Sequence, residues 1–161
     1  MSHSSPSSAI QVACPGCDGL TRVPAGRLGD NPLCPRCKAR LFGGKPVTLN
    51  ASNFDRQVGQ SGVPVVVDFW APWCGPCHAM APHFESAAGR LEPRFRFAKL
   101  DTDAAPDVAA RFNIRSIPTL IVFREGKPVA QQSGVMDSGR LTRWLESVSG
   151  SAGTAFTTGT A

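Results

Sequence analysis

Two cysteines, Cys74 and Cys77, enclose glycine and proline in the run WCGPC, directly behind the apolar stretch 63–71. This position is where a buried strand gives way to a helix. A sulfur at the start of a helix faces free backbone N–H groups and the positive end of the helix dipole, which favour a thiolate over a thiol. A thiolate attacks disulfides, and a second thiol nearby can close a ring and release the product. The pattern predicts a redox-active dithiol, with Cys74 as nucleophile and Cys77 as resolving thiol. A structural disulfide or half of a metal site is the alternative.

Asp68 lies in the middle of the apolar stretch, six residues before Cys74. Burying a carboxylate costs roughly several kcal/mol unless it is paired or protonated. Burial also raises the pKa of a carboxyl group toward the range that a proton carrier needs. Asp68 is therefore a candidate acid/base beside the dithiol, and a buried structural pair is the alternative.

Four further cysteines follow the pattern Cys-x₂-Cys-x₁₆-Cys-x₂-Cys, which falls within zinc-ribbon spacing. Each short turn can present two sulfurs to one ion, so the four would close a tetrahedral site with no open position for a substrate. A module of about 33 residues buries too little apolar surface to fold alone, and metal binding would stabilise it. We expect one structural Zn²⁺; additional disulfides or free thiols are the alternative. The predicted ligands are Cys14, Cys17, Cys34 and Cys37.

Composition limits the compartment and the partners. The first residues, MSHSSPSS, have neither a basic segment nor an apolar segment, and no stretch of the chain reaches the roughly 18 apolar residues of a membrane span. We therefore expect a cytoplasmic protein that makes no membrane contact, in a reducing compartment that suits metal or redox cysteines. The charge of +5 is concentrated in residues 1–46, which carry six Lys/Arg against two Asp. We interpret this as a solvated basic surface and do not expect a nucleic-acid partner.

The chain divides into segments of different character. We expect a disordered Ser-rich start (1–9), a zinc ribbon (10–42), a hinge (43–46), a larger domain (47–149) and a flexible tail (150–161). Apolar periodicity within the larger domain predicts strands at 47–49, 63–71, 95–100, 117–123 and 128–133. Helices are expected at 52–60, 74–91 and 106–112, with a last one capped by Ser138. This order predicts an α/β fold with parallel strands first and a hairpin last.

The larger domain resembles the thioredoxin family over roughly residues 47–149. The resemblance rests on FWAPWCGPC (69–77), Pro82, KLD (99–101), IPT (117–119) and Gly134. It implies the thioredoxin fold, a mixed central sheet flanked by helices. It also implies a protein-disulfide reductase whose Gly75-Pro76 dipeptide favours the reductant role. NADPH-dependent thioredoxin reductase would renew the dithiol, and disulfide-containing proteins would be the clients.

The resemblance also assigns roles to other residues. Asp68 would take the proton from Cys77 during resolution, and Lys99 would approach the Asp68 carboxylate. A cis bond before Pro118 would leave the Ile117 backbone free to pair with an extended client. His78 and Pro72 depart from the commoner family residues beside the dithiol. The residues expected to bind clients are Trp73, Gly75, Pro76, Ile117, Pro118 and Gly134.

A ribbon in front of such a domain resembles the zinc-containing thioredoxin-2 group of bacterial thioredoxins, over about residues 10–149. This resemblance implies a redox-sensitive zinc module and no tightly bound organic cofactor, and we expect a monomer. Two other functions remain open at this point. One is a redox-regulated zinc-binding interaction module, and the other is a chaperone-like or metal-buffering role.

Overall fold

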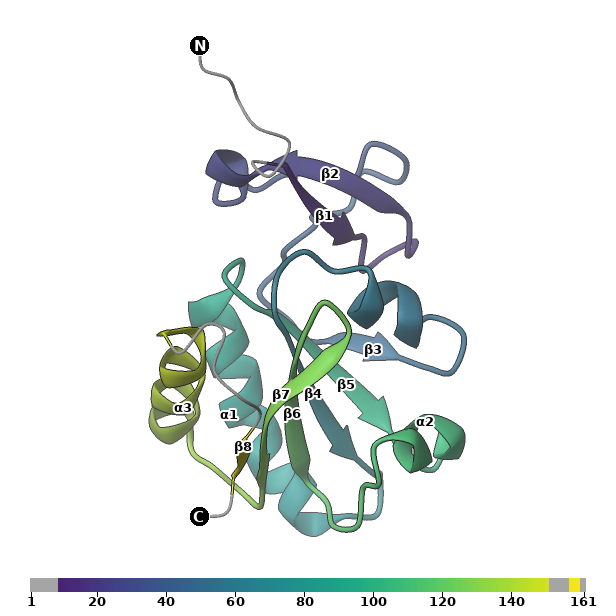
Figure 1. Ribbon diagram of the computed structural model, residues 1–161, viewed down its shortest axis with the longest axis vertical. Helices are drawn as coiled ribbons and strands as arrows, with labels where there is room; N and C mark the ends of the chain where they lie inside the picture. The colour runs from purple at the N-terminus through teal and green to yellow at the C-terminus, as the bar shows by residue number, and fades with distance from the viewer. Residues whose placement is uncertain (1–8, 151–156, 160–161) are drawn as a thin grey trace.

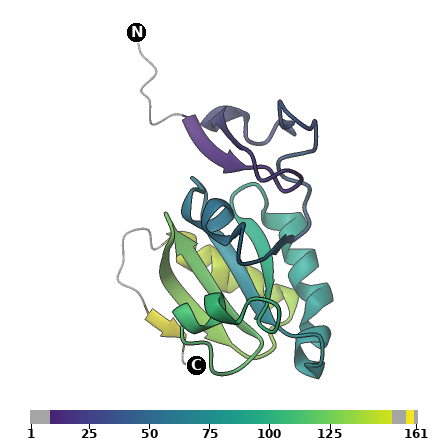
Figure 2. The same cartoon turned by 90° about the vertical axis from the view of Figure 1, so that its right-hand side faces the viewer.

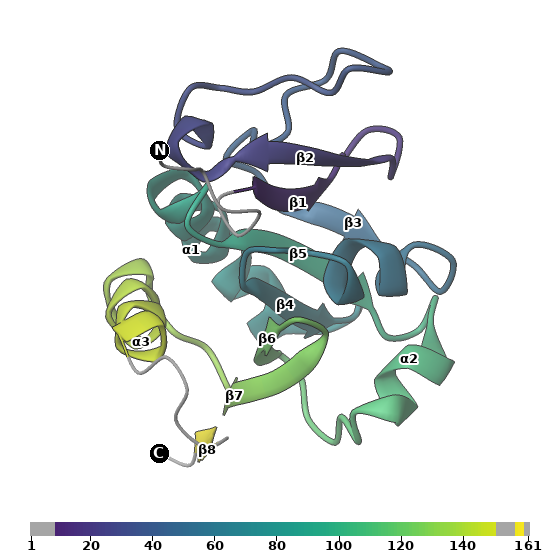
Figure 3. The ribbon, with the colours of Figure 1, turned by 45° about the horizontal axis from the view of Figure 1, so that its top comes forward.

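A six-stranded mixed sheet forms the centre of the larger part of the chain (Figure 1). The computed structural model describes residues 9–150 and 157–159. The strands lie in the order β3-β5-β4-β6-β7-β8, which Figure 3 shows from above. β3 (Val47–Leu49), β5 (Arg96–Asp101) and β4 (Val65–Trp70) are parallel, while β6 (Thr119–Arg124) and β7 (Lys127–Ser133) form an antiparallel hairpin. The predicted mixed sheet flanked by helices is confirmed.

Helices cover both faces of this sheet (Figure 2). α1 (Gly75–Leu91) and α3 (Ser138–Gly150) pack on one face, while η3 (Asp55–Gly59) and α2 (Pro106–Arg111) pack on the other. β4 is an almost continuous apolar run because alternate side chains enter two different cores. Val66 joins the core under α1 and α3, and Val65 and Val67 join the other.

Two predicted helix starts were wrong in detail. The segment expected as a helix over 52–60 contains a short π-helix without a side-chain cap, and the Asn50 side chain accepts the N–H groups of Ser52 and Asn53 in the turn that precedes it. In α3, Ser138 is the first helical residue, and Asp137 Oδ1 accepts the Arg140 N–H at 2.8 Å. At α3 the aspartate before the predicted serine takes the role, because its oxygen reaches a free N–H group of the first turn.

The C-terminal stretch contains a strand within the segment expected to be a flexible tail. β8 (Thr157–Gly159) pairs in parallel with β7, next to residues 130–132. Gly150, the first residue of the expected tail, ends α3, while residues 151–156 and 160–161 of the tail and residues 1–8 of the predicted disordered start lie outside the described residues. Backbone hydrogen bonds to the open edge of β7 are sufficient for such pairing, so it needs no apolar pattern.

A small N-terminal module, residues 9–42, stands beside the end of the sheet at which β4 and β5 begin (Figure 1). Its hairpin joins β1 (Ala9–Ala13) and β2 (Leu20–Pro24), followed by a turn of 3₁₀-helix, η2 (Ala25–Arg27). Gly62, ahead of β4, donates its N–H to Gln11 O at 2.8 Å. A Cβ on Gly62 would lie 2.9 Å from Ile10 Cγ2, so the close approach of β1 requires glycine there.

The predicted hinge segment is held by the larger domain. The Gly44 N–H donates to Glu92 Oε1 at 3.0 Å, and the Glu92 side chain is buried at the end of α1. The WCGPC run follows β4 and begins α1, so the dithiol and the N-terminal module lie at opposite ends of the sheet (Figure 1). Among the described helices, none has the length and apolar character needed to cross a membrane.

Candidate redox site and metal site

The dithiol lies at the N-terminus of α1, where β4 ends. Cys74 is the N-cap of the helix, and its sulfur accepts the Cys77 N–H at 3.2 Å. Cys74 and Cys77 form a disulfide with their Cα atoms 5.3 Å apart, and both side chains are buried. Cys74 therefore faces free helix N–H groups, the environment that stabilises a thiolate. The structure brings the two cysteines together as the spacing predicted.

The loop that precedes β6 faces the dithiol. The Ile117 carbonyl oxygen lies 3.9 Å from Cys74 Sγ, and the following bond to Pro118 is cis. The Gly134 N–H donates to Pro118 O at 2.9 Å, and Gly134 has a φ of +95°, a conformation that favours glycine. The loops around Pro118 and Gly134 are thus joined beside Cys74. Pro118 itself is buried, whereas Gly75 and Pro76 are exposed at the start of α1.

Trp73 is the most exposed large apolar side chain near the dithiol, at 71 %. Its indole Nε1–H donates to Asp103 Oδ2 at 2.8 Å, which fixes the ring although most of it is in solvent. A cavity of about 200 Å³ lies between this ring and Ile117, and Arg115 also lines it. The arrangement is a shallow, partly apolar groove beside the reactive sulfurs.

Sequence reasoning missed Asp103 and Arg115 as parts of this groove. Asp103 lies in the turn after β5, 30 residues from its partner Trp73. No local motif joins the two positions, because the fold alone brings the β4 and β5 loops together at the carboxyl ends of parallel strands. Arg115 precedes Ile117 by two residues and could have been included from its proximity to the IPT motif.

Asp68 is 1 % exposed, and its Oδ1 has no hydrogen-bond partner among the described residues. Burial raises its pKa from 3.8 to about 7, and the positive charge of Lys99 partly opposes this rise. Lys99 is the neighbour of Asp68 in the β4–β5 register, but its ammonium lies 4.4 Å from the centre of the Trp70 ring. Lys99 therefore acts on the carboxyl group as a nearby charge and forms no ion pair with it in the described part of the chain.

Replacing Asp68 with asparagine should stabilise the fold at high pH. A carboxyl group whose folded pKa is raised contributes stability below pH 4 that is lost as the pH rises through about 7, because the native state binds the proton more tightly. The asparagine amide stays neutral, so urea unfolding should show Asp68→Asn gaining stability over the wild type between pH 4 and pH 8. The gain at pH 8 is on the order of 4 kcal/mol. Asp107→Asn, at an exposed position on α2, serves as control. A stability difference between Asp68→Asn and the wild type that does not change with pH would contradict the raised pKa of Asp68.

His78, one of the two departures from the family pattern, contacts the loop that precedes the dithiol. Its Nε2 lies 2.6 Å from the Pro72 carbonyl oxygen, and its ring packs edge-on against Trp70 at 6.0 Å between centroids. The imidazole thus links the start of α1 to the loop that precedes it. The two departures contact one another.

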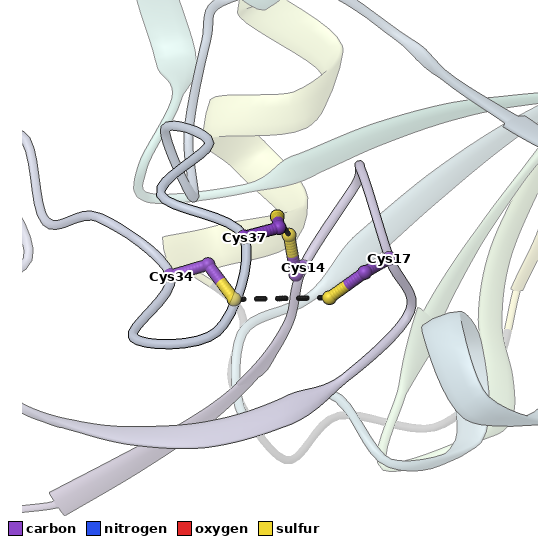
Figure 4. Close-up of side chains that lie close together, drawn as sticks. All are labelled: Cys14, Cys17, Cys34 and Cys37. Atoms are coloured by element: carbon purple, nitrogen blue, oxygen red, sulfur yellow. Dashed lines mark hydrogen bonds between the residues drawn. The ribbon is translucent and has the colours of Figure 1, made fainter.

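The other four cysteines converge in the N-terminal module (Figure 4). All four sulfurs lie within 4.8 Å of one another. Cys14 Sγ is 3.5 Å from Cys37 Sγ, and Cys17 Sγ is 3.7 Å from Cys34 Sγ. These close approaches join the two turns, as expected of four ligands around one point.

The two cysteine turns have the same backbone geometry. In the first turn, residues 14–19, the Cys14 N–H donates to Gly19 O, and Cys14 O accepts the N–H of Asp18. The second turn, residues 34–39, repeats both bonds at equivalent positions, Cys34 to Ala39 and Lys38 to Cys34. The residue after the second cysteine of each turn, Asp18 or Lys38, has a positive φ of 60° or 67°.

The donor set fits a tetrahedral zinc ion. In each turn a backbone N–H donates to the first sulfur, from Gly16 to Cys14 at 3.2 Å and from Arg36 to Cys34 at 3.4 Å. Such bonds stabilise thiolates, and the backbone N–H groups of Cys37 and Arg36 lower the pKa of Cys34 to about 6. Burial raises the pKa of Cys14 to about 12. Four sulfurs this close together are the ligand set that structural zinc takes, and a cation would offset their mutual repulsion.

Comparisons with known proteins point to one family. The thioredoxin family model matches residues 45–147. Thioredoxin C-3 of Corynebacterium nephridii is 42 % identical over 135 residues, which cover 84 % of this chain and 92 % of the relative. A chloroplastic M-type thioredoxin of Chlamydomonas reinhardtii is 37 % identical over 77 % of this chain and 91 % of its own length. A thioredoxin of Staphylococcus saprophyticus is 46 % identical over 62 % of this chain and 94 % of its own length.

Proposed function

The chain belongs to the thioredoxin family of thiol-disulfide oxidoreductases, and we propose that it reduces protein disulfides through Cys74 and Cys77 while a structural zinc ion holds its N-terminal module. The observation that carries the reductase assignment is the disulfide-forming pair at the N-terminus of α1, facing the Ile117–Pro118 turn. This placement joins a thiolate-stabilising helix end to the backbone of Ile117, with which an extended client can pair.

The reaction begins with the Cys74 thiolate of the reduced protein. It attacks one sulfur of a client disulfide, forming a mixed disulfide and releasing the other client sulfur as a thiolate that takes up a proton. Cys77 then loses its proton to Asp68 and attacks Cys74 Sγ. The Cys74–Cys77 disulfide forms, and the second client sulfur leaves as a thiolate that takes the proton from Asp68. The dithiol gives two electrons to the client disulfide, which becomes two thiols, one with a proton from solvent and the other with the Cys77 proton passed through Asp68.

Asp68 suits the proton transfer of the second step. The carboxyl group belongs to β4 and shares the face of Val66, which α1 covers. With a pKa of about 7, it is partly ionised at neutral pH and can accept a proton in one step and return it in another. Lys99 would stabilise the charged form from the neighbouring strand.

Clients would dock in the groove beside the dithiol. The backbone of Ile117 can pair with an extended client segment, while Trp73 and the cavity next to it receive the flanking side chains. Gly75, Pro76, Pro118 and Gly134 shape the surface around this contact. Asp103 orients the Trp73 ring.

The zinc ion would be held by the four cysteines of the N-terminal module, as in the thioredoxin-2 group. When bound it supplies a cross-link between the two cysteine turns, and no substrate position. The dithiol lies at the opposite end of the sheet, so within one chain the four cysteines cannot exchange disulfides directly with Cys74. For the same reason we assign the module no part in the chemical step. The other partners we propose are an NADPH-dependent thioredoxin reductase and disulfide-containing clients in a reducing cytoplasm.

Zinc content and thiol reactivity together test this proposal. Reduced, desalted wild-type protein should contain one zinc per chain and two rapidly reacting thiols, and the Cys74→Ser/Cys77→Ser variant should lack those two thiols and keep the zinc. Reduction of a protein disulfide by the wild type, and its loss in the variant, should accompany this result. Six thiols that react alike in protein without zinc would refute the metal site. A wild type that reduces no protein disulfide would refute the reductase.

A further inference from the structure

Two buried polar side chains of the larger domain reach into the N-terminal module. Gln57 of η3 is 1 % exposed and Arg96 of β5 is 2 % exposed. Gln57 Nε2 donates to Cys14 O at 2.9 Å, and Arg96 Nη2 donates to Ala13 O at 2.8 Å. The backbone carbonyl of a predicted zinc ligand and the carbonyl just before it are thus both held from outside the module.

The same contact extends to the end of the first cysteine turn. Gln57 Nε2 also lies 2.6 Å from Asp18 Oδ1, and Asn53 Nδ2 donates to the same oxygen at 3.4 Å. Asp18 is the residue with positive φ that follows Cys17. The first turn is therefore fixed at its start and at its end by side chains from residues 53–96.

The second cysteine turn provides an internal comparison. It has the same backbone hydrogen bonds as the first, yet no side chain of residues 44–149 donates to residues 34–39 in the described structure. Arg36 and Lys38 of this turn are exposed to solvent. The larger domain therefore positions only one of the two cysteine turns.

Arg96 also places a positive charge at the base of the metal site. Its guanidinium stacks on the Phe42 ring at 4.5 Å and faces Glu92 at 3.9 Å. Four thiolates around Zn²⁺ carry two net negative charges, so a buried cation beside Cys14 favours the occupied site.

We propose that Gln57 and Arg96 are positioning residues of the metal site, which hold the Cys14–Cys17 half so that the module binds zinc more tightly when docked on the larger domain. The inference rests on the zinc binding proposed above. Hydrogen bonds of this kind orient metal ligands from outside the coordination shell, and losing one typically costs about 10–100-fold in metal affinity. Zinc affinity would then depend on whether the module is docked, and docking would depend on whether zinc is bound.

Competition with a chromophoric chelator on the full-length zinc-loaded protein tests the proposal. The Gln57→Glu variant keeps the side-chain size but turns a carboxylate toward Cys14 O and the Asp18 carboxylate. Its apparent zinc affinity should fall by about 10–100-fold. Gln131→Glu, the same change on β7, is the matched control and should bind zinc as the wild type does. For Arg96→Gln the control is Arg94→Gln, whose guanidinium is exposed and faces Glu146.

A second measurement separates positioning from general destabilisation. Urea unfolding should show that the larger domain of Gln57→Glu is still folded, and its disulfide reductase activity should stay at the wild-type value. Wild-type zinc affinity in Gln57→Glu would overturn the proposal, as would a loss of zinc affinity found only in variants whose larger domain is unfolded. Should Arg96→Gln fail to fold because Glu92 loses its partner, Gln57→Glu decides the outcome. A wild type without zinc would instead refute the proposed zinc function, and this inference with it.

Discussion

The Cys74→Ser variant is expected to lose disulfide reductase activity by about a thousand-fold or more, because the hydroxyl group that replaces the nucleophile does not ionise near neutral pH. Cys74 caps α1, and its sulfur accepts the Cys77 N–H, so the helix end that favours the thiolate remains in the variant without a thiolate to stabilise. Steady-state reduction of a protein disulfide, coupled to NADPH through thioredoxin reductase, measures the loss.

Cys77→Ser tests the order of the two chemical steps, and Ala79→Ser is the control. Cys77→Ser keeps the attacking sulfur, so it should accumulate a mixed disulfide with a client, which non-reducing electrophoresis detects. Ala79→Ser, an exposed position in the same helix, should retain wild-type turnover. Turnover that survived in Cys74→Ser would show that Cys74 is not the nucleophile, and it would favour a chaperone-like or interaction role for the chain.

Local signals explain why the reactive groups could be predicted from the sequence. Both kinds of site are built from Cys-x-x-Cys pairs, and the two residues of each pair are close in the chain, so the pairs can be read directly from the sequence. Asp68 was predictable for a different reason, because a carboxylate in an apolar strand violates the pattern around it. Its burial and raised pKa follow from the strand alone.

Contacts between distant segments could not be predicted in this way. The Trp73–Asp103 bond spans 30 residues, and the Gln57 and Arg96 contacts with the N-terminal module span 43 and 83. A glutamine in a helix and an arginine in a strand are ordinary surface residues by type, yet both are buried here and both donate to carbonyls of the module. The strand β8 escaped prediction because pairing with an open sheet edge uses backbone groups, which every sequence provides.

Removing zinc is expected to unfold the N-terminal module while the larger domain stays folded. The apolar core of the module is small, and two of its buried members are the predicted ligands Cys14 and Cys34. Structural zinc contributes about 10–16 kcal/mol of apparent binding free energy in small modules, more than so few apolar contacts can replace. The contacts of Gln57 and Arg96 hold only the first cysteine turn, so they cannot fold the second.

Amide hydrogen exchange on zinc-loaded and chelator-treated protein measures this expected result. Amides of β1 and β2 should lose their protection after zinc removal, whereas those of β4 in the same molecules should keep theirs. Reductase activity should stay within about two-fold, because the dithiol is at the opposite end of the sheet and a docked module makes no contact with it. If β1 stayed protected without zinc, docking and not metal would fold the module. A large loss of activity would instead mean that the two ends of the sheet are coupled through β4 and β5, the strands that run from the module to the redox site.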